Sequence, residues 1–204
     1  WGPNSASDVS NVIEVCKANK LVVILEVHDT TGYGEASAAC SLARAVEYWK
    51  SIKNVLDGQE KYVIINIGNE PYGNNNYGNW VSDTTNAIIA MRNAGFKHTL
   101  MVDAPNWGQD WSSTMLNNAE LVFNSDPLKN TILSIHMYGV YNTATKVANY
   151  LSYYLNKNLP IVVGEFGYKH SDGDPDEAAI MSFAQQNRIG YIGWSWCGNG
   201  GGVE

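Results

Sequence analysis

Two short apolar runs, each leading to a glutamate, constrain this chain more than any other feature. Residues 64–67 are apolar apart from Asn66 and lead to Glu70, after which Pro71 prevents a strand from continuing. Residues 159–164 repeat the plan and lead to Glu165. Runs of this kind are typical of strands buried on both faces, as in parallel sheets. The sequence therefore predicts two buried strands that each present a carboxylate at the carboxyl end.

A parallel α/β barrel would bring these two glutamates together. All strands of such a barrel open their carboxyl ends onto one face, so residues far apart in sequence meet in a single cleft. Paired carboxylates are what a glycosidase needs, one to protonate the leaving oxygen and one to attack or to activate water. A single strand followed by glutamate is more simply a solvated strand end. Two of them, with histidines and aromatics at other strand ends, favour a site.

Helical and strand patterns alternate along the whole chain. The first helix is expected to be capped by Ser7 or Asp8, and the last by Asp174, with Pro175 as its first residue. A turn-rich loop at 72–78 carries Tyr72 and Tyr77, which are expected to line a groove. The predicted strands cover residues 21–27, 64–70, 99–103, 131–138, 159–165 and 191–196, and the predicted helices cover 8–18, 42–56, 80–94, a short stretch before 131, 143–157 and a segment from 174.

Six strands with a helix before each fit either an open doubly wound sheet or part of a (β/α)8 TIM barrel. An open sheet gathers its site at one switch point, whereas here every strand end offers a polar or aromatic candidate. No glycine-rich phosphate loop follows any strand. We therefore predict an α/β fold of the barrel type, with candidates at His28, Glu70, Asp103, His136, Glu165 and Trp194.

Composition points to one domain that acts on neutral ligands. The 204 residues form a single predicted domain, 1–204, with a net charge of −7 and scattered basic residues, which argues against nucleic acid as a partner. Seven Trp and twelve Tyr offer flat faces suited to sugar rings. No apolar run approaches a membrane span, and nothing at Trp1 resembles a signal peptide. Cys16, Cys40 and Cys197 have no metal-ligand spacing and are expected to be buried free thiols.

Five motifs together resemble glycoside hydrolase family five, in the clan of retaining barrel enzymes. They occur in the family's order and cover essentially the whole chain. Within the family, the segments at 101–109 and 165–174 are most similar to those of bacterial endo-β-1,4-mannanases. The motifs are LEVHD at 25–29, NIGNEP at 66–71, SIHMY at 134–138, VGEFG at 163–167 and GWSW at 193–196.

The resemblance implies a role for each matching residue. Glu70 would be the general acid/base and Glu165 the nucleophile, about 5 to 5.5 Å apart as retention of configuration requires. Glu165 would be ionised with help from Tyr138, whereas neighbouring charge and burial would raise the pKa of Glu70. The other implied site residues bind or orient the sugar: His28, Asn69 at the 2-hydroxyl, Trp107, His136, Tyr138 and Trp194 as the stacking floor, with Trp196 on the same strand face.

One departure from the family concerns the number of strands. The family barrel has eight strands and a final helix, whereas this chain matches about strands three to eight. The family's arginine at the end of the second strand has no counterpart here. We therefore expect an incomplete barrel whose first and last strands, those leading to His28 and Trp194, each have one edge without a partner. Such a chain alone is expected to be poorly stable and weakly active.

The family resemblance also implies partners and a location. The expected substrate is β-mannan or a related plant polysaccharide, with no cofactor, no metal, no nucleic acid and no membrane. The domain is expected to be monomeric, alone or within a larger modular enzyme, and secreted. Three alternatives remain: an endo-β-1,4-glucanase of the same family, a non-catalytic carbohydrate-binding module, and a metal-dependent hydrolase using His28, Asp29, His136 and His170.

Overall fold

The computed structural model describes residues 3–196, which form one parallel sheet with helices along one side. The elements in chain order are α1 (Ala6–Ala18), β1 (Val23–Glu26), η1 (His28–Thr30), α2 (Leu42–Ser51), α3 (Lys53–Leu56), β2 (Val63–Asn66), η2 (Tyr77–Asn79), α4 (Trp80–Asn93), β3 (Thr99–Asp103), α5 (Thr114–Ser125), β4 (Thr131–Met137), η3 (Gly139–Tyr141), α6 (Ala144–Asn156), β5 (Ile161–Phe166), α7 (Glu177–Asn187) and β6 (Gly190–Gly193).

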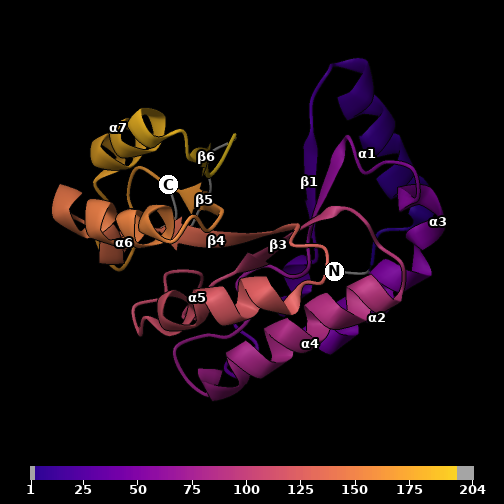
Figure 1. Cartoon of the computed structure of the whole chain (residues 1–204), viewed down its shortest axis with the longest axis horizontal. Helices are drawn as coiled ribbons and strands as arrows, with labels where there is room; N and C mark the ends of the chain where they lie inside the picture. The colour runs from indigo at the N-terminus through magenta and orange to yellow at the C-terminus, as the bar shows by residue number, and fades with distance from the viewer. Residues whose placement is uncertain (1–2, 197–204) are drawn as a thin grey trace.

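The sheet follows the order of the sequence. Its strand order is β1-β2-β3-β4-β5-β6, and every neighbouring pair is parallel. In Figure 1 the strands form an open arc with the helices along its outer side, and β1 and β6 lie on opposite sides of the opening. Within residues 3–196, each of these two strands has one edge without a strand partner, as predicted. The fold is the incomplete α/β barrel that the sequence indicated.

The apolar runs of the strands form the core against the helices. The completely buried residues include Ile65, Leu100, Leu133 and Val163 of the strands and Trp80, Ile88 and Met91 of α4. The helices cover the outer face of the sheet, and these strand residues pack against them there. The core therefore runs along the whole sheet and supports its carboxyl edge.

Two tryptophans tie the helices to the strand ends that lead into the site. The buried indole of Trp49 in α2 donates to the carbonyl of Ile67 at 3.0 Å, just after β2. Trp80 at the start of α4 donates likewise to the carbonyl of Asp103 at 3.0 Å, at the end of β3. Each bond satisfies a polar group in the interior while the ring fills the core. These contacts fix the positions from which the site residues project.

A buried ion pair joins α4 to the segment after α5. The guanidinium of Arg92 binds both oxygens of Asp126, with distances of 2.9 and 2.8 Å, and the two side chains are 4% and 0% exposed. The remaining donors of Arg92 bind the carbonyls of Phe96, His98 and Asn130. Burial alone would raise the pKa of Asp126, but the Arg92 bonds outweigh it and lower that pKa to about 2. The pair is fully satisfied and belongs to the scaffold.

Two helix starts differ from the prediction. The N-cap of α1 is Ser5, whose hydroxyl accepts from the Asp8 amide while the Asp8 carboxylate accepts from the Ser5 amide at 2.9 Å. Asp8 therefore completes a capping box instead of opening the helix. The cap of α7 is Asp176 and not Asp174, because the Asp176 amide is held by the carbonyl of Tyr141 while its carboxylate accepts from Ala179.

Strand ends are also shorter than predicted. The strand β2 ends at Asn66, so Glu70 lies on the segment after it, with φ 40° in the left-handed region. The strand β6 ends at Gly193, so Trp194 and Trp196 follow the strand, and the expected shared strand face does not exist. Trp194 lines the pocket described below, whereas Trp196 is completely exposed. Likewise β1 begins at Val23.

Two of the three cysteines lie in the described part of the chain. Cys16 and Cys40 are free thiols, as predicted, but they are half-buried and not fully buried. Cys197 lies outside the described residues. None of the helices in residues 3–196 combines the length and the apolar character that crossing a bilayer requires.

Candidate active site

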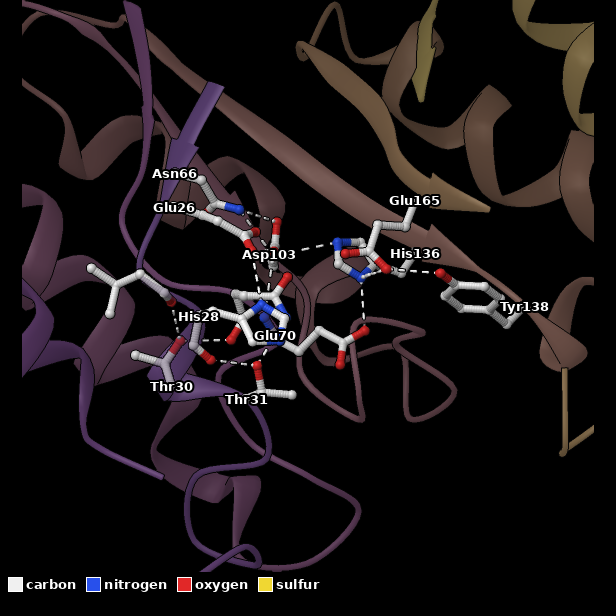
Figure 2. Close-up of polar contacts among 12 residues, drawn as sticks. Glu26, His28, Thr30, Thr31, Asn66, Glu70, Asp103, His136, Tyr138 and Glu165 are labelled. Atoms are coloured by element: carbon white, nitrogen blue, oxygen red, sulfur yellow. Dashed lines mark hydrogen bonds and ion pairs between the residues drawn. The ribbon is translucent and has the colours of Figure 1, made fainter. Parts of the chain in front are cut away.

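Four neighbouring strands deliver acidic and imidazole side chains to the carboxyl edge of the sheet. Glu70 follows β2, Asp103 ends β3, His136 lies near the end of β4 and Glu165 near the end of β5. The β4–β5 register places His136 directly beside Glu165, with a register shift just before that pair. Figure 2 shows the four side chains converging from separate strands. The strand-end pattern in the sequence therefore does bring the predicted glutamates together.

The two predicted catalytic carboxylates lie close enough for a retaining mechanism. One oxygen of Glu70, one oxygen of Glu165 and a ring nitrogen of His136 all lie within 4.8 Å of one another. Retaining glycosidases hold their carboxyl groups about 5 to 5.5 Å apart, whereas inverting enzymes need about 6.5 to 9.5 Å to admit a water molecule. The observed spacing agrees with the short, retaining arrangement. Both side chains are about one-seventh exposed, at 13% and 14%, so they remain accessible to a ligand.

His136 lies behind the carboxylates and contacts three of them. Its Nδ1 donates to Glu70 Oε1 at 2.8 Å and lies 3.5 Å from Glu165 Oε2, and its Nε2 lies 3.3 Å from Asp103 Oδ2. The Gly108 backbone covers the ring, since a Cβ there would lie 2.6 Å from it. Burial alone would lower the pKa of His136, but the charges of Asp103 and Glu165 outweigh it and raise that pKa well above its usual range. The His136 ring is thus buried among acids, which favour its protonated form.

Tyr138 binds the other carboxylate. Its hydroxyl donates to Glu165 Oε2 at 2.8 Å, as the sequence led us to expect. Burial nevertheless raises the pKa of Glu165 to about 7, and the charge of Glu70 adds to it, while His136 and Tyr138 oppose the rise. This result differs from the expectation that Glu165 is the readily ionised member of the pair. The reason is that desolvation at this depth exceeds what the two donors supply.

A hydrogen-bonded chain positions Asn69 and His28 on the side of β1. Thr31 donates to the His28 carbonyl at 2.6 Å and accepts from Asn69 Nδ2 at 2.9 Å, which fixes the orientation of the amide. The oxygen Oδ1 of Asn69 is buried without a partner in the described part of the chain. It is therefore able to accept a bond from a ligand hydroxyl. The His28 ring binds Glu26 at 2.8 Å, and this bond raises the pKa of His28.

A pocket of about 450 Å³ contains almost all the predicted residues. The sequence-predicted residues that line it are Glu70, Glu165, His28, Asn69, Trp107, Tyr138 and Trp194, while His136 lies buried behind it. The further lining residues are Thr31, Asn74, Gln109, Trp111, Val140, His170 and Asp172. Its three indole rings and its many amide and carboxylate groups suit a neutral, polyhydroxylated ligand.

The loop at 72–78 differs from the prediction. Tyr72 is buried and its hydroxyl binds Asp83, and neither it nor Tyr77 lines the pocket. Tyr77 instead packs edge-on against the ring of Trp111, with centroids 5.9 Å apart. The loop contributes Asn74, whose side-chain oxygen accepts from the Trp111 indole at 2.7 Å. A turn-rich sequence shows that a loop is present but not which way its rings face.

Two positioning groups were not given a role from the sequence. Asp103 was named as a strand-end candidate, but its link to both Glu70 and His136 depends on contacts among β3, β4 and the segment after β2. Asp172 accepts from Gln109 Nε2 at 2.8 Å and from the Gly139 amide at 3.2 Å, so it ties together three loops around the pocket. Only the acidic character of these positions was visible in the sequence.

The metal-dependent alternative is not supported by the placement of its residues. Among residues 3–196, the histidines and acids close enough to share a metal ion are Glu70, His136 and Glu165, and not the set His28, Asp29, His136 and His170. In that trio, His136 and Tyr138 already donate to the carboxylate oxygens. These contacts are those of two carboxylates that accept hydrogen bonds from neighbouring side chains.

Comparison with known proteins agrees with this geometry. The sequence profile described as cellulase (glycosyl hydrolase family 5) matches residues 1–200. A β-mannanase/endoglucanase A from Caldicellulosiruptor saccharolyticus is 64% identical over 200 residues, covering 98% of this chain and 15% of that protein. A mannan endo-1,4-β-mannosidase from Streptomyces lividans is 60% identical over 205 residues, covering 100% of this chain and 53% of that protein.

A solved structure shows the same architecture. The β-mannanase from Thermomonospora fusca superimposes with a TM-score of 0.97 at 59% sequence identity, covering 100% of this chain and 68% of that one. This chain spans about half, or less, of the length of these two curated relatives.

Proposed function

The chain belongs to glycosyl hydrolase family 5, and we propose that it carries the active site of a retaining endo-β-1,4-mannanase. The observation that carries the proposal is the pair Glu70 and Glu165, with oxygens within 4.8 Å at the carboxyl edge of a parallel sheet. The mannanase names of relatives more than 50% identical support mannan over cellulose as the substrate. An endo-β-1,4-glucanase activity is the alternative to be tested beside it.

Each carboxylate takes one role in a double displacement. Glu165 attacks the anomeric carbon as Glu70 gives its proton to the glycosidic oxygen, which breaks the bond and leaves a covalent glycosyl–enzyme. Glu70 then removes a proton from water, which attacks the same carbon and releases Glu165 with net retention. The Tyr138 bond fixes Glu165 for attack, and the His136 bond to Oε1 leaves the other oxygen of Glu70 free to face the leaving group.

The pocket walls would hold the sugars around these acids. Asn69 offers its buried oxygen to a hydroxyl next to the scissile bond, and Trp194 offers its ring as a stacking floor. Trp107 and His28 line the same space. The substrate class would be mannan, galactomannan or glucomannan, handled without a cofactor. We place the enzyme outside the cell, where plant polysaccharide is found, as a monomeric catalytic domain or part of a modular protein.

Release of reducing ends from three polymers tests this proposal. Galactomannan, glucomannan and carboxymethyl-cellulose are incubated with the 204-residue chain and with a longer chain of relative-like length. We expect cleavage of the two mannans to exceed that of carboxymethyl-cellulose. Preferential cleavage of carboxymethyl-cellulose would make the protein a glucanase instead.

The variant Glu165→Gln separates an enzyme from a binding module. Without its nucleophile an enzyme loses turnover by several orders of magnitude but still binds mannan in affinity electrophoresis. The exposed substitution Glu120→Gln serves as the control and should retain activity. Binding of mannan with no turnover in any form of the protein would identify a carbohydrate-binding module.

A further inference from the structure

A completely buried carboxylate lies one layer below the two catalytic candidates. Asp103 at the end of β3 has no exposed surface and does not line the pocket. It accepts two bonds from Asn66 Nδ2, at 3.1 and 3.0 Å, and one from the amide of Glu70 at 3.2 Å. Its Oδ2 also lies 3.3 Å from Nε2 of His136. Figure 2 shows these contacts radiating from Asp103 toward both sides of the site.

A charge at this depth requires compensation. Removing a carboxylate from water costs several kcal/mol unless a cation and further donors surround it. The imidazole of His136 is the cation that pairs with Asp103 in the described structure, and Asn66 and the Glu70 amide supply the donors. Burial alone would raise the pKa of Asp103, but His136 and then Asn66 outweigh it and lower that pKa. Asp103 and His136 thus each favour the charged form of the other.

The carboxylate of Asp103 contacts the backbone of Glu70 directly and reaches its side chain through His136. The backbone of Glu70 has φ 40°, which an L-residue rarely adopts and which needs surrounding contacts to persist. Asp103 provides one such contact by accepting the Glu70 amide. Through His136 it also reaches the side chain, since Nδ1 of the same ring donates to Glu70 Oε1 at 2.8 Å. The main chain and the carboxylate of Glu70 are therefore set by one buried anion.

We propose that Asp103 is a positioning residue that holds His136 as an imidazolium and so places a fixed positive charge between Glu70 and Glu165. This inference rests on the proposed function of those two glutamates. The charged groups facing His136 are Asp103 from β3, Glu70 from the segment after β2, and Glu165 from β5. The fixed charge favours ionisation of Glu165 before attack, and the constant Nδ1–H donor prevents Oε1 of Glu70 from carrying the transferable proton.

The substitution Asp103→Asn separates charge from shape. One oxygen of Asp103, Oδ2, accepts from the Glu70 amide and also faces Nε2 of His136, so the asparagine oxygen at that place keeps the bond from the amide. The NH₂ group replaces Oδ1 and so loses the bond from Asn66, while the negative charge that keeps His136 protonated is removed and with it the positive charge beside Glu165. Because an opposite charge within about 4 to 6 Å depresses a carboxyl pKa by about 1 to 3 units, the acidic limb of kcat/KM should move to higher pH by that order.

Nitrogen-15 NMR of the histidine rings provides the test that does not depend on turnover. The chain has four histidines, so His136 can be assigned by comparison with a His136→Gln sample. We expect both ring nitrogens of His136 to be protonated from pH 5 to 8 in the unsubstituted protein, and one of them in Asp103→Asn. A neutral His136 in the unsubstituted protein overturns the inference even if the variant does not fold. Retention of both protons in the variant overturns it as well.

The pH profile and a matched variant test the functional consequence. Asn66→Ala removes the neutral bonds to Asp103 but keeps the Asp103–His136 pair, so its acidic limb should stay near that of the unsubstituted protein. Equal loss of kcat in both variants with no movement of the limb would reduce Asp103 to a structural role. A protein inactive on every polysaccharide would instead contradict the proposed function, while the NMR result still judges the charge on His136.

Discussion

At the scale of single residues, the two glutamates are distinguished by their donors. Glu70 is bound by the His136 imidazolium and Glu165 by the neutral Tyr138 hydroxyl. The acid must hold a proton until it donates it, whereas the nucleophile must be ionised before it attacks. Differences in environment of this kind separate the pKa values of two carboxyl groups. The assignment of roles therefore leads to distinct kinetic expectations for each residue.

The variant Glu70→Ala should affect substrates according to their leaving group. Polysaccharide needs a proton on the departing oxygen, so kcat should fall by about 10²- to 10⁴-fold. The aryl group of an activated aryl β-mannoside leaves without being protonated, so the rate at which the glycosyl–enzyme forms should be little changed. Added azide should then yield the β-mannosyl azide, identified by NMR of the product. Equal losses on both substrates would contradict the assignment of Glu70 as acid/base.

The ionisation of Glu165 should set the acidic side of the activity profile. The carboxylate must be deprotonated to attack, and burial raises its pKa to about 7, so kcat/KM should rise as the pH increases through about 7. Tyr138→Phe removes a donor that stabilises the ionised form, so the rise should move to higher pH. Tyr48→Phe loses only a bond to the carbonyl of Asn4 and serves as the control. An unmoved limb in Tyr138→Phe would assign the ionisation to another group.

Sequence alone identified the residues that line the pocket better than those that support them. Glu70 and Glu165 follow apolar strands, and a parallel sheet necessarily gathers such positions at one edge. Asp103 needed more, because its role depends on Asn66, Glu70 and His136 approaching from three neighbouring segments. The pKa of Glu165 could not be predicted either, because it depends on the balance of burial against two donors.

At the scale of elements, periodicity located the strands and helices while local contacts decided where they end. The strand β3 has the predicted bounds, since polar residues flank its apolar run. The starts of α1 and α7 were misplaced by two or three residues because several serines and aspartates compete to cap each helix. The residue that caps α7, Asp176, is decided by the bond from its amide to the distant carbonyl of Tyr141, which no local pattern reveals.

The Arg92–Asp126 pair should contribute to stability and not to catalysis. Asp126→Asn leaves Arg92 buried without its counter-charge, which should lower the free energy of unfolding by about 3 to 5 kcal/mol in urea titration. The exposed pair Lys157–Glu120 offers the matched control, and Glu120→Gln should cost less than about 1 kcal/mol. Similar losses in the two variants would contradict the buried contribution.

The same pair has a defined dependence on pH. The folded-state pKa of Asp126 is about 2, below its usual value, so its contribution is present above about pH 4 and is lost as the pH falls toward 2. The stability difference between the unsubstituted protein and Asp126→Asn should therefore shrink below pH 4. Urea titrations at pH 3 and pH 6 measure it, and a constant difference would show that the carboxylate is not the source.

At the scale of the whole molecule, the described sheet has two open edges. Exposed apolar side chains accompany the first of them, with Leu21 and Val22 preceding β1 and Val12 and Val15 on the outer face of α1. Unpaired edges and apolar patches of this kind are normally covered in a stable domain. The open edges were predicted because the sequence matches about strands three to eight of the family barrel. Residues 3–196 supply no strand that covers them.

A longer chain with two further strands against β1 and β6 should be more stable and more active. Closing the sheet buries additional apolar surface, so both the urea midpoint and the dependence of unfolding free energy on urea should increase. Mannan hydrolysis by the two proteins is measured in parallel at equal concentration. A 204-residue chain that unfolds cooperatively at the same midpoint and has full activity would contradict this expectation.

The strand order has a consequence for how the molecule is made. Each strand pairs with the next one along the chain, across the helices that lie between them in sequence, and β6 joins last. A polypeptide emerging from the ribosome can therefore dock each β-α unit on the edge left by the previous one, without waiting for a distant partner. Glu70 would be delivered early and Glu165 late, so the catalytic pair is assembled only when synthesis has passed the fifth strand.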